Sequence, residues 1–426
     1  MIVQFQLQNF RSFSDIQIFS MRSQGKSVKN KELPDNEILL GEEKFLKSAV
    51  LYGGNASGKS NFLRAFGHFA FIVQNSINFV ESGSLNLNPF ILDSESENKP
   101  TEFEIIIFLN GSYYRYGFSA NLNGIVEEWL YVKKVKQSKV FHRNGNLIEV
   151  GDTYKILKDK IFQKTIHKNS LVLSKGATFN EAICGILYNY IANTFFVLSP
   201  QDILFRNYSI TGLNDSVKYS FILNLLQSAD TGIESIVLHN HEVDQYSFQI
   251  QNNSGKLETN HPEITKGIVQ QDVKSVRTRA DGSEISTFFS EMESEGTQKL
   301  FHLSAILYDC LKEGRALIID ELDTKFHPLL TKKIIELFQK ESTNPKHSQL
   351  IFATHDTNLL SKEIFRRDQI WFVEKDRSGS SHLIPLSDYN IRNDLDIRKN
   401  YLEGKFGAIP YLGKFDYNMN NKKSFV

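Results

Sequence analysis

The sequence predicts an α/β fold with a mostly parallel core sheet, an antiparallel β lobe and a helical lobe, and three observations support this prediction. An apolar strand within residues 45–52 leads into a glycine-rich turn and a helix that starts near Ser60. Residues 101–150 alternate apolar and polar side chains, with Asn-Gly pairs between the runs, as in antiparallel hairpins. From Gly296 onward helical and strand patterns alternate, which is typical of parallel sheets with crossover helices.

The remaining elements follow from the same periodicities. Alternation predicts N-terminal strands over residues 2–7 and 16–19, and a helix over 180–193 precedes a strand over 194–198. The polar residues 229–287 carry only a short expected hairpin, near 247–251. The C-terminal alternation predicts helices over 298–311, 329–338 and 359–365 and strands over 316–319, 349–353 and 369–373.

These elements suggest a division of the chain into four parts. We expect a first α/β lobe over 1–200, a helical insertion lobe over 201–295, a return to the core over 296–390, and a C-terminal tail over 391–426.

Composition and charge exclude several classes of protein. The chain has 426 residues, 41% hydrophobic and 23% charged, which are values of an ordinary globular protein. Its 49 basic and 49 acidic residues balance, so net charge gives no argument for nucleic-acid binding. Its two cysteines, Cys184 and Cys310, form no disulfide or metal pattern. Signal-peptide and membrane-span patterns are absent, so we expect a soluble cytoplasmic protein with no membrane partner.

The glycine-rich turn matches the phosphate-binding pattern GxxxxGK[ST]. Its glycines let main-chain N–H groups approach phosphate oxygens, and the following helix adds its positive end. Lys59 would neutralise the β and γ phosphates of ATP, and Ser60 would ligate Mg²⁺. We expect the nucleotide to contact Gly53, Gly54, Asn55, Ala56, Ser57, Gly58, Lys59, Ser60 and Asn61.

A second element supplies carboxylates. The apolar strand over residues 316–319 ends in Asp320 and Glu321, which places both at the carboxyl edge of a parallel sheet, where ligands bind. Asp320 would hold Mg²⁺, and Glu321 would orient or deprotonate the attacking water. Taken alone, a strand that ends in Asp-Glu is usually a solvated strand end, and only the phosphate loop makes catalysis the better interpretation.

Two further features have an ordinary and a functional interpretation. Ser294 and Gly296 precede an apolar helix. A serine in this position is commonly a simple N-cap, but the N-terminus of the capped helix could also point at an anion. Thr354 and His355 follow the strand over 349–353, where polar residues are equally ordinary. Taken singly, each favours the ordinary interpretation.

The order of these motifs resembles the ATP-binding cassette ATPases, specifically the soluble branch that contains SMC, RecF, OLD and coiled-coil break-repair proteins. The resemblance implies that Ser294 and Gly296 act in trans on a γ-phosphate held by a second copy of the chain. It implies that His355 contacts the same phosphate and that Asp323 lies in a loop crossing the dimer interface. Lys59, Glu321 and His355 would then be the catalytic residues.

The same resemblance suggests two further contacts. The segment over residues 9–13 is similar to the opening motif of that branch, which would place Arg11 beside the nucleotide. Gln201, after the strand over 194–198, occupies the place of the Q-loop and could join Mg²⁺ to the γ-phosphate, although a Gln after Pro is also an ordinary turn.

A narrower resemblance is to the RloA family of bacterial abortive-infection ATPases of the AAA type. The similar segments are residues 88–92, 100–103, 293–297, 320–323, 327–328, 367–375 and 401–410. This resemblance implies a role in anti-phage defence with a separate effector, such as an RloB-type or Toprim nuclease. About 50 residues follow Val373, which is too few for a nuclease domain in this chain.

We therefore expect an ATPase whose two heads enclose ATP and Mg²⁺ and which acts as a switch controlling an effector. A DNA-repair ATPase of the RecF or coiled-coil kind is one alternative, and a nucleotide-binding scaffold without hydrolysis is another. DNA contact could involve the basic strip at Lys133, Lys134, Lys136, Lys139, His142 and Arg143, although a solvated sheet face is the simpler interpretation.

Overall fold

The computed structural model describes residues 1–24, 33–79, 85–199, 204–247, 250–253, 256–259, 263–392 and 395–410. Within these residues a six-stranded core sheet has the order β11, β17, β18, β5, β19, β20. All neighbours pair in parallel except β19 and β20. The strands are β5 (Ser48–Tyr52), β11 (Phe195–Leu198), β17 (Ala316–Ile319), β18 (Gln349–Ala353), β19 (Ile370–Lys375) and β20 (Ser381–Pro385).

The central strands of this sheet are buried on both faces and separate two hydrophobic cores. In β17, Ile318 packs into one core, while Leu317 and Ile319 pack into the other. The same alternation runs along β18, where Ile351 and Phe352 point to opposite cores. Such strands read as continuous apolar runs, which is why the sequence identifies them.

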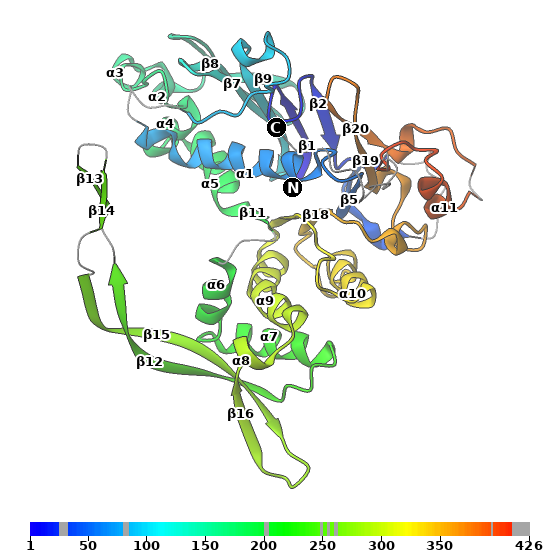
Figure 1. The fold of residues 1–426 in the computed structure, drawn as a ribbon. Coiled ribbons are helices and arrows are strands. Elements are labelled where there is room, and N and C mark those ends of the chain that lie inside the picture. The colour runs from blue at the N-terminus through cyan, green and yellow to red at the C-terminus, as the bar shows by residue number, and fades with distance from the viewer. Residues whose placement is uncertain are drawn as a thin grey trace, which may run out of the picture.

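The first core lies between the core sheet and a seven-stranded antiparallel sheet, with helix α1 (Lys59–Asn75) between the two sheets (Figure 1). Phe66 of α1 stacks on Phe5 at a ring-centroid distance of 3.9 Å, and Phe62 and Phe69 meet Phe5 edge-on. The sheet order is β10 (Leu147–Val150), β9 (Gln137–Asn144), β8 (Gly124–Lys133), β7 (Ser112–Asn121), β6 (Thr101–Leu109), β1 (Ile2–Gln8), β2 (Gln17–Ser20).

Shorter elements complete this side of the molecule. A two-stranded sheet pairs β3 with β4, and four helices follow the antiparallel sheet. These elements are β3 (Glu37–Leu40), β4 (Glu43–Leu46), α2 (Lys155–Lys158), α3 (Lys160–Lys164), α4 (Val172–Thr178) and α5 (Ala182–Thr194).

The second core joins the other face of the core sheet to a helical lobe. Helix α9 (Glu295–Glu313) packs against α6 (Leu204–Gly212) and α7 (Ser216–Ser228), and α10 (Pro328–Gln339) packs beside β18 and β5. This lobe carries a long β ribbon that projects from the body (Figure 1). No helix in the described parts of the chain is long and apolar enough to cross a membrane.

The predicted fold class is confirmed, but the segment between β18 and β19 is not a helix. Residues 359–365 hold turns, beginning with a 3₁₀ turn at Thr357–Leu359. Four apolar side chains here are buried: Leu359, Leu360, Ile364 and Phe365. On a helix these positions would spread far beyond one stripe, and here turns bury all four side chains instead.

The polar region 229–287 contains more regular structure than the short hairpin expected near 247–251. Strands β12 (Ser235–Ser247) and β15 (Glu263–Thr278) pair over nearly their full length, and β16 (Glu284–Phe288) adds to β15. Strands β13 (Ile250–Asn253) and β14 (Lys256–Thr259) pair separately, and residues 248–249 lie outside the described residues. This ribbon is formed by main-chain pairing between strands whose side chains alternate only weakly between apolar and polar, so the sequence pattern does not predict it.

The aromatic packing of α1 allows a stability prediction. Replacing Phe66 by Ala should lower the free energy of unfolding by about 3–5 kcal/mol, because it removes a fully buried ring between two sheets. Urea denaturation followed by circular dichroism measures this change. The matched control is Phe71→Ala on the same helix, where the side chain is 49% exposed. A loss for Phe66→Ala no larger than the control's would contradict the prediction.

Candidate functional site

The glycine-rich loop forms a tight turn between β5 and α1. Gly58 is the N-cap residue of α1, which begins at Lys59. Ser57 N–H donates to Gly54 O at 3.2 Å, and Ala56 and Gly58 have positive φ angles of 60° and 118°. A turn of this kind at the positive end of a helix is the arrangement that binds phosphate.

Strand β20 and the N-terminal segment support this loop from behind. The Ser381 hydroxyl donates to Ser57 O at 2.6 Å, and Ser381 N–H donates to Ser12 O at 2.6 Å. The Asn61 side chain donates to the Ser12 hydroxyl at 3.0 Å. A Cβ atom on Gly58 would lie 2.4 Å from Ser381 Oγ, so only glycine fits there.

Lys59 lies inside the loop that it would serve. Its Nζ donates to Gly53 O at 2.8 Å and to Gly54 O at 3.1 Å, and the residue is only 6% exposed. Burial lowers the pKa of Lys59, while the carboxylates of Asp320 and Glu321 act in the opposite direction. The ammonium group is therefore held close to the acidic end of β17.

Asp320 and Glu321 follow β17 directly. Asp320 N–H donates to Leu198 O of the neighbouring strand at 2.9 Å, and Glu321 has a φ angle of 50°. This left-handed conformation costs a residue with a side chain about 1–2 kcal/mol. Adjacent residues of a strand point to opposite faces. The bend at Glu321 instead lets both carboxylates line one cavity, and Thr324 Oγ1 donates to Glu321 Oε2 at 3.1 Å.

His355 follows β18 and is linked to the loop after Glu321. His355 N–H donates to Asp323 Oδ2 at 3.3 Å. Burial and the nearby Lys59 ammonium group lower the pKa of His355, against the effect of the surrounding carboxylates. The imidazole is therefore mainly neutral at pH 7 and can donate one ring N–H.

A cavity of about 470 Å³ brings seven of the predicted loop residues together with Asp320, Glu321 and His355, while Gly53 and Gly54 do not line it. It lies where the carboxyl ends of β5, β17, β18 and β19 meet. Its lining consists of Asn55, Ala56, Ser57, Gly58, Lys59, Ser60, Asn61, Asp320, Glu321, His355 and Lys375.

Arg11 lines a second cavity, of about 580 Å³, which shares Asn61 and Lys375 with the first. Arg11 has a φ of 51°, and its buried Nε has no hydrogen-bond partner among the described residues. Burial and the charge of Arg64 lower the pKa of the Arg11 guanidinium group. Apolar residues form much of this cavity: Leu87, Pro89, Phe90, Ile91, Leu92 and Leu122.

Ser294 and Gly296 do not line the cavity around Lys59. Ser294 is exposed, and its hydroxyl accepts from Thr297 N–H at 3.1 Å, so it caps α9 as the sequence predicts. A Cβ on Gly296 would lie 2.6 Å from Lys325 O. Within one chain this helix end is thus packed against the loop after Glu321. Gln201 lies outside the described residues, so its predicted role is untested.

Sequence reasoning missed two groups at this site, Lys375 and Ser381. Lys375 is the last residue of β19 and lines both cavities, and Ser381 opens β20 and contacts the phosphate loop. The signal for Lys375 was its position at the end of another parallel strand. Ser381 carries no comparable signal, because its role depends on the antiparallel return of β20.

The segment that includes α11 (Ile397–Leu402) also contacts the phosphate loop and the strand before it. Tyr401 packs edge-on against Tyr52 at a ring-centroid distance of 5.7 Å, and Tyr52 donates its hydroxyl to Asp356 O at 2.9 Å. A Cβ on Gly54 would lie 3.2 Å from the Pro410 nitrogen. This late part of the chain therefore contacts the end of β5 and the phosphate loop.

The donor set fits a divalent cation held partly by phosphate. Asp320 Oδ1 is buried and has no hydrogen-bond partner in the described part of the chain. The Ser60 hydroxyl lines the same cavity. Among the described residues there is no cluster of three or more His, Cys, Asp or Glu side chains able to hold a metal alone. Mg²⁺ bound with nucleotide needs only such sparse oxygen ligands.

This fold and cavity define a P-loop nucleotide-binding protein. The family described as "AAA domain, putative AbiEii toxin, Type IV TA system" matches residues 48–361, a range that includes the phosphate loop, Asp320, Glu321 and His355. The chain belongs to this family of AAA ATPases. No curated protein matches it.

Solved SMC heads are similar to this chain at low identity. The SMC head domain from Thermotoga maritima has a TM-score of 0.41 and 12% identity over 90% of this chain and 98% of that chain. An SmcHead bound to the C-winged helix domain of ScpA has a TM-score of 0.39 and 14% identity over 90% and 96%. An Smc head bound to the C-terminal domain of ScpA derived from Pyrococcus furiosus has 0.37 and 12% over 95% and 98%.

The geometry of the loop predicts an effect on nucleotide binding. Gly58→Ala should raise the Kd for ATP about 10-fold or more, since a Cβ would collide with Ser381 and φ is positive there. Fluorescence of a labelled ATP analogue measures the Kd. The control is Gly185→Ala in α5, where a Cβ meets nothing within 4 Å. Equal affinities for the two variants would refute the assigned loop geometry.

Proposed function

We propose that this protein is an ATPase that binds ATP and Mg²⁺ between two copies of the chain and uses hydrolysis to switch between paired and separated states. One observation carries this proposal: the phosphate loop, Asp320, Glu321 and His355 line one cavity at the edge of the core sheet. Binding alone would need the loop but not a carboxylate in the position of Glu321.

Each group has a defined task in the proposed reaction. The N-terminus of α1 and Lys59 bind the phosphates, with Lys59 exchanging the two loop carbonyls for phosphate oxygens. Ser60 and Asp320 would hold Mg²⁺, which neutralises phosphate charge when bound. Glu321 orients the attacking water and accepts its proton, and the neutral His355 donates a hydrogen bond to the γ-phosphate.

The second cavity suggests where the nucleoside lies. It adjoins the phosphate cavity through Asn61 and Lys375, and it combines apolar walls with the Arg11 guanidinium group. A base and ribose that leave the phosphate loop in this direction would contact Arg11. This arrangement supports the contact that the resemblance implies for Arg11.

The position of Ser294 supports a site completed by a second chain. Ser294 sits at the exposed N-terminus of a long helix and lies outside the cavity of its own chain. A helix end in this position can complete the phosphate site of another copy. Binding of ATP then favours the paired state, and hydrolysis releases it.

We further propose that the switch serves anti-phage defence by controlling a separate effector protein. Two considerations support this: the AbiEii wording of the family description and the RloA-like segments of the sequence. An RloB-type or Toprim-type nuclease is the proposed effector. Co-expression during phage infection, comparing wild type with Lys59→Met, tests whether protection requires both genes and an intact phosphate loop.

Glu321→Gln should lower the rate of phosphate release about 100-fold or more, because the amide cannot accept a proton from water. ATP binding should persist, and the ATP-bound pair should become long-lived in size-exclusion chromatography. The measurement is phosphate release with Mg²⁺. Glu363→Gln, at an exposed position, is the control. If the wild type releases phosphate no faster than Glu321→Gln, the protein is a nucleotide-binding scaffold.

Ser294→Arg should abolish turnover by blocking the trans contact while leaving ATP binding to the single chain intact. Mixing Ser294→Arg with Glu321→Gln should restore activity, because mixed pairs contain one complete site. The recovery should reach about a quarter of the wild-type rate if chains pair at random about a two-fold axis.

The control is Ser220→Arg on the exposed side of α7, which should behave as wild type. Undiminished turnover by Ser294→Arg would show that the site lies within a single chain.

The phosphate-release assay with added DNA tests the DNA-repair alternative, which requires that DNA stimulates hydrolysis and that this stimulation falls steeply with salt. Structure weakens that alternative, since Arg143 is 1% exposed and Lys139 pairs with Glu149 at 2.6 Å.

A further inference from the structure

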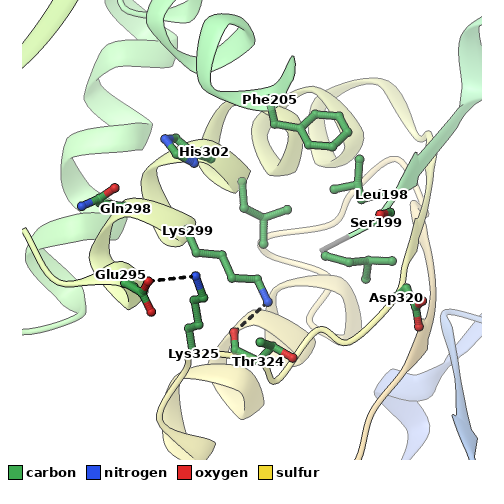
Figure 2. Close-up of a pocket in the computed structure, with 12 residues that line it drawn as sticks. Leu198, Ser199, Phe205, Glu295, Gln298, Lys299, His302, Asp320, Thr324 and Lys325 are labelled. Atoms are coloured by element: carbon green, nitrogen blue, oxygen red, sulfur yellow. Dashed lines mark hydrogen bonds and ion pairs between the residues drawn. The ribbon is translucent and has the colours of Figure 1, made fainter. Parts of the chain in front are cut away.

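Lys299 makes contacts that the reaction described above does not use. Its Nζ lies 3.0 Å from Glu321 O, 3.1 Å from Leu322 O and 2.8 Å from Thr324 O, so three main-chain carbonyls surround one ammonium group. The same Nζ lies 4.7 Å from the centre of the Phe326 ring. Figure 2 shows the Lys299 side chain reaching from α9 to Thr324.

These carbonyls belong to the backbone bend that follows β17 and begins at Glu321. Glu321 has a left-handed backbone with φ of 50°, and Leu322 N–H donates to Ala353 O at 3.1 Å. A bend of this kind persists only where surrounding contacts hold it. Lys299 binds the carbonyl of the Glu321–Leu322 peptide and that of the following peptide, so it holds the backbone directly after Glu321.

Lys299 also belongs to the helix that begins after Ser294. Near the start of this helix, Lys325 O packs against Gly296, and Lys325 Nζ forms an ion pair with Glu295 at 3.3 Å (Figure 2). The exposed helix end and the loop after Glu321 are thus joined by several independent contacts. They should move together as one unit.

We propose that Lys299 is a positioning residue that holds the bend at Glu321 and connects it to the Ser294 end of α9. When Ser294 of one chain contacts the γ-phosphate bound by the second chain, this connection transmits the contact to Glu321 in the first chain. This inference rests on the proposed ATPase function. Lys299 itself does not line the phosphate cavity, so its effect is on turnover and not on nucleotide affinity.

The charge on Lys299 is sensitive to pH. Burial lowers the pKa of Lys299 to about 8. The negative charges of Asp323 and Glu321 act to raise this pKa, and the positive charge of Lys325 acts to lower it further. Lys299 lines a cavity of about 230 Å³, and the other titratable groups that line it are Asp320, which follows β17, Glu295 and His302 of α9, and Lys325. Because burial lowers the folded pKa below the usual value, the charged form is lost as pH rises through about 8. An arginine at this position would keep its charge.

The test compares Lys299→Met and Lys299→Arg in the full-length protein with Lys312→Met as the matched control. Lys312 lies at the exposed end of the same helix. Lys299→Met should lower kcat about 10- to 100-fold, as expected for a misplaced catalytic group. The Kd for a labelled non-hydrolysable ATP analogue should stay near the wild-type value. Lys299→Arg should recover most of the rate, and Lys312→Met should match wild type.

The pH profile separates positioning from a purely structural role. Wild-type kcat should fall as pH rises through about 8, because Lys299 loses its charge there, and Lys299→Arg should keep its rate in that range. If Lys299→Met fails to fold, the comparison of these two profiles decides alone. Wild-type turnover in Lys299→Met, or identical profiles for wild type and Lys299→Arg, would overturn the proposal.

The failure of this inference can be distinguished from the failure of the proposed function. In the first case Ser294→Arg and Glu321→Gln still abolish turnover while Lys299→Met does not. In the second case those two variants retain wild-type turnover.

Discussion

The common carboxyl edge of β5, β17, β18 and β19 is the constraint on which the site depends. The carboxyl ends of parallel strands lie at the same edge of the sheet, so the residues that follow these strands lie close together although they are far apart in the sequence. Here that edge collects the phosphate loop, two carboxylates, an imidazole and Lys375 around one cavity. The two hydrophobic cores on either face fix these strands, so the spacing of the charged groups follows from packing that lies outside the site.

Electrostatics at this edge are balanced within the chain. Lys59 is buried against the carbonyls of its own loop, while carboxylates at the end of β17 lie close enough to favour its charge. Asp320 keeps one buried oxygen without a hydrogen-bond partner in the described residues. The Lys59 ammonium group can exchange its neutral carbonyl acceptors for phosphate oxygens, and this Asp320 oxygen can bind a cation. The site therefore suits a polyanion that binds together with a cation.

Much of this architecture could be predicted from the sequence, because the informative residues obey local rules. The continuous apolar runs of β5, β17 and β18 identify buried parallel strands, and Ser294 has the composition of a helix cap. The segment 359–365 could not be predicted, since its apolar residues are buried by a chain without helical geometry. Likewise, Arg143 belongs to a basic run in the sequence but donates to Ser170 O at 2.6 Å in the interior. Only the fold distinguishes a buried guanidinium group from a surface one.

The placement of α11 and Pro410 against the phosphate loop has a consequence for biosynthesis. Tyr401, Pro410 and Ser381 all support residues that a ribosome has completed more than three hundred positions earlier. A nascent chain that already carries the glycine-rich loop therefore lacks the surfaces that hold it in shape. The shape of the glycine-rich loop is thus expected to form only after nearly the whole chain has been synthesised.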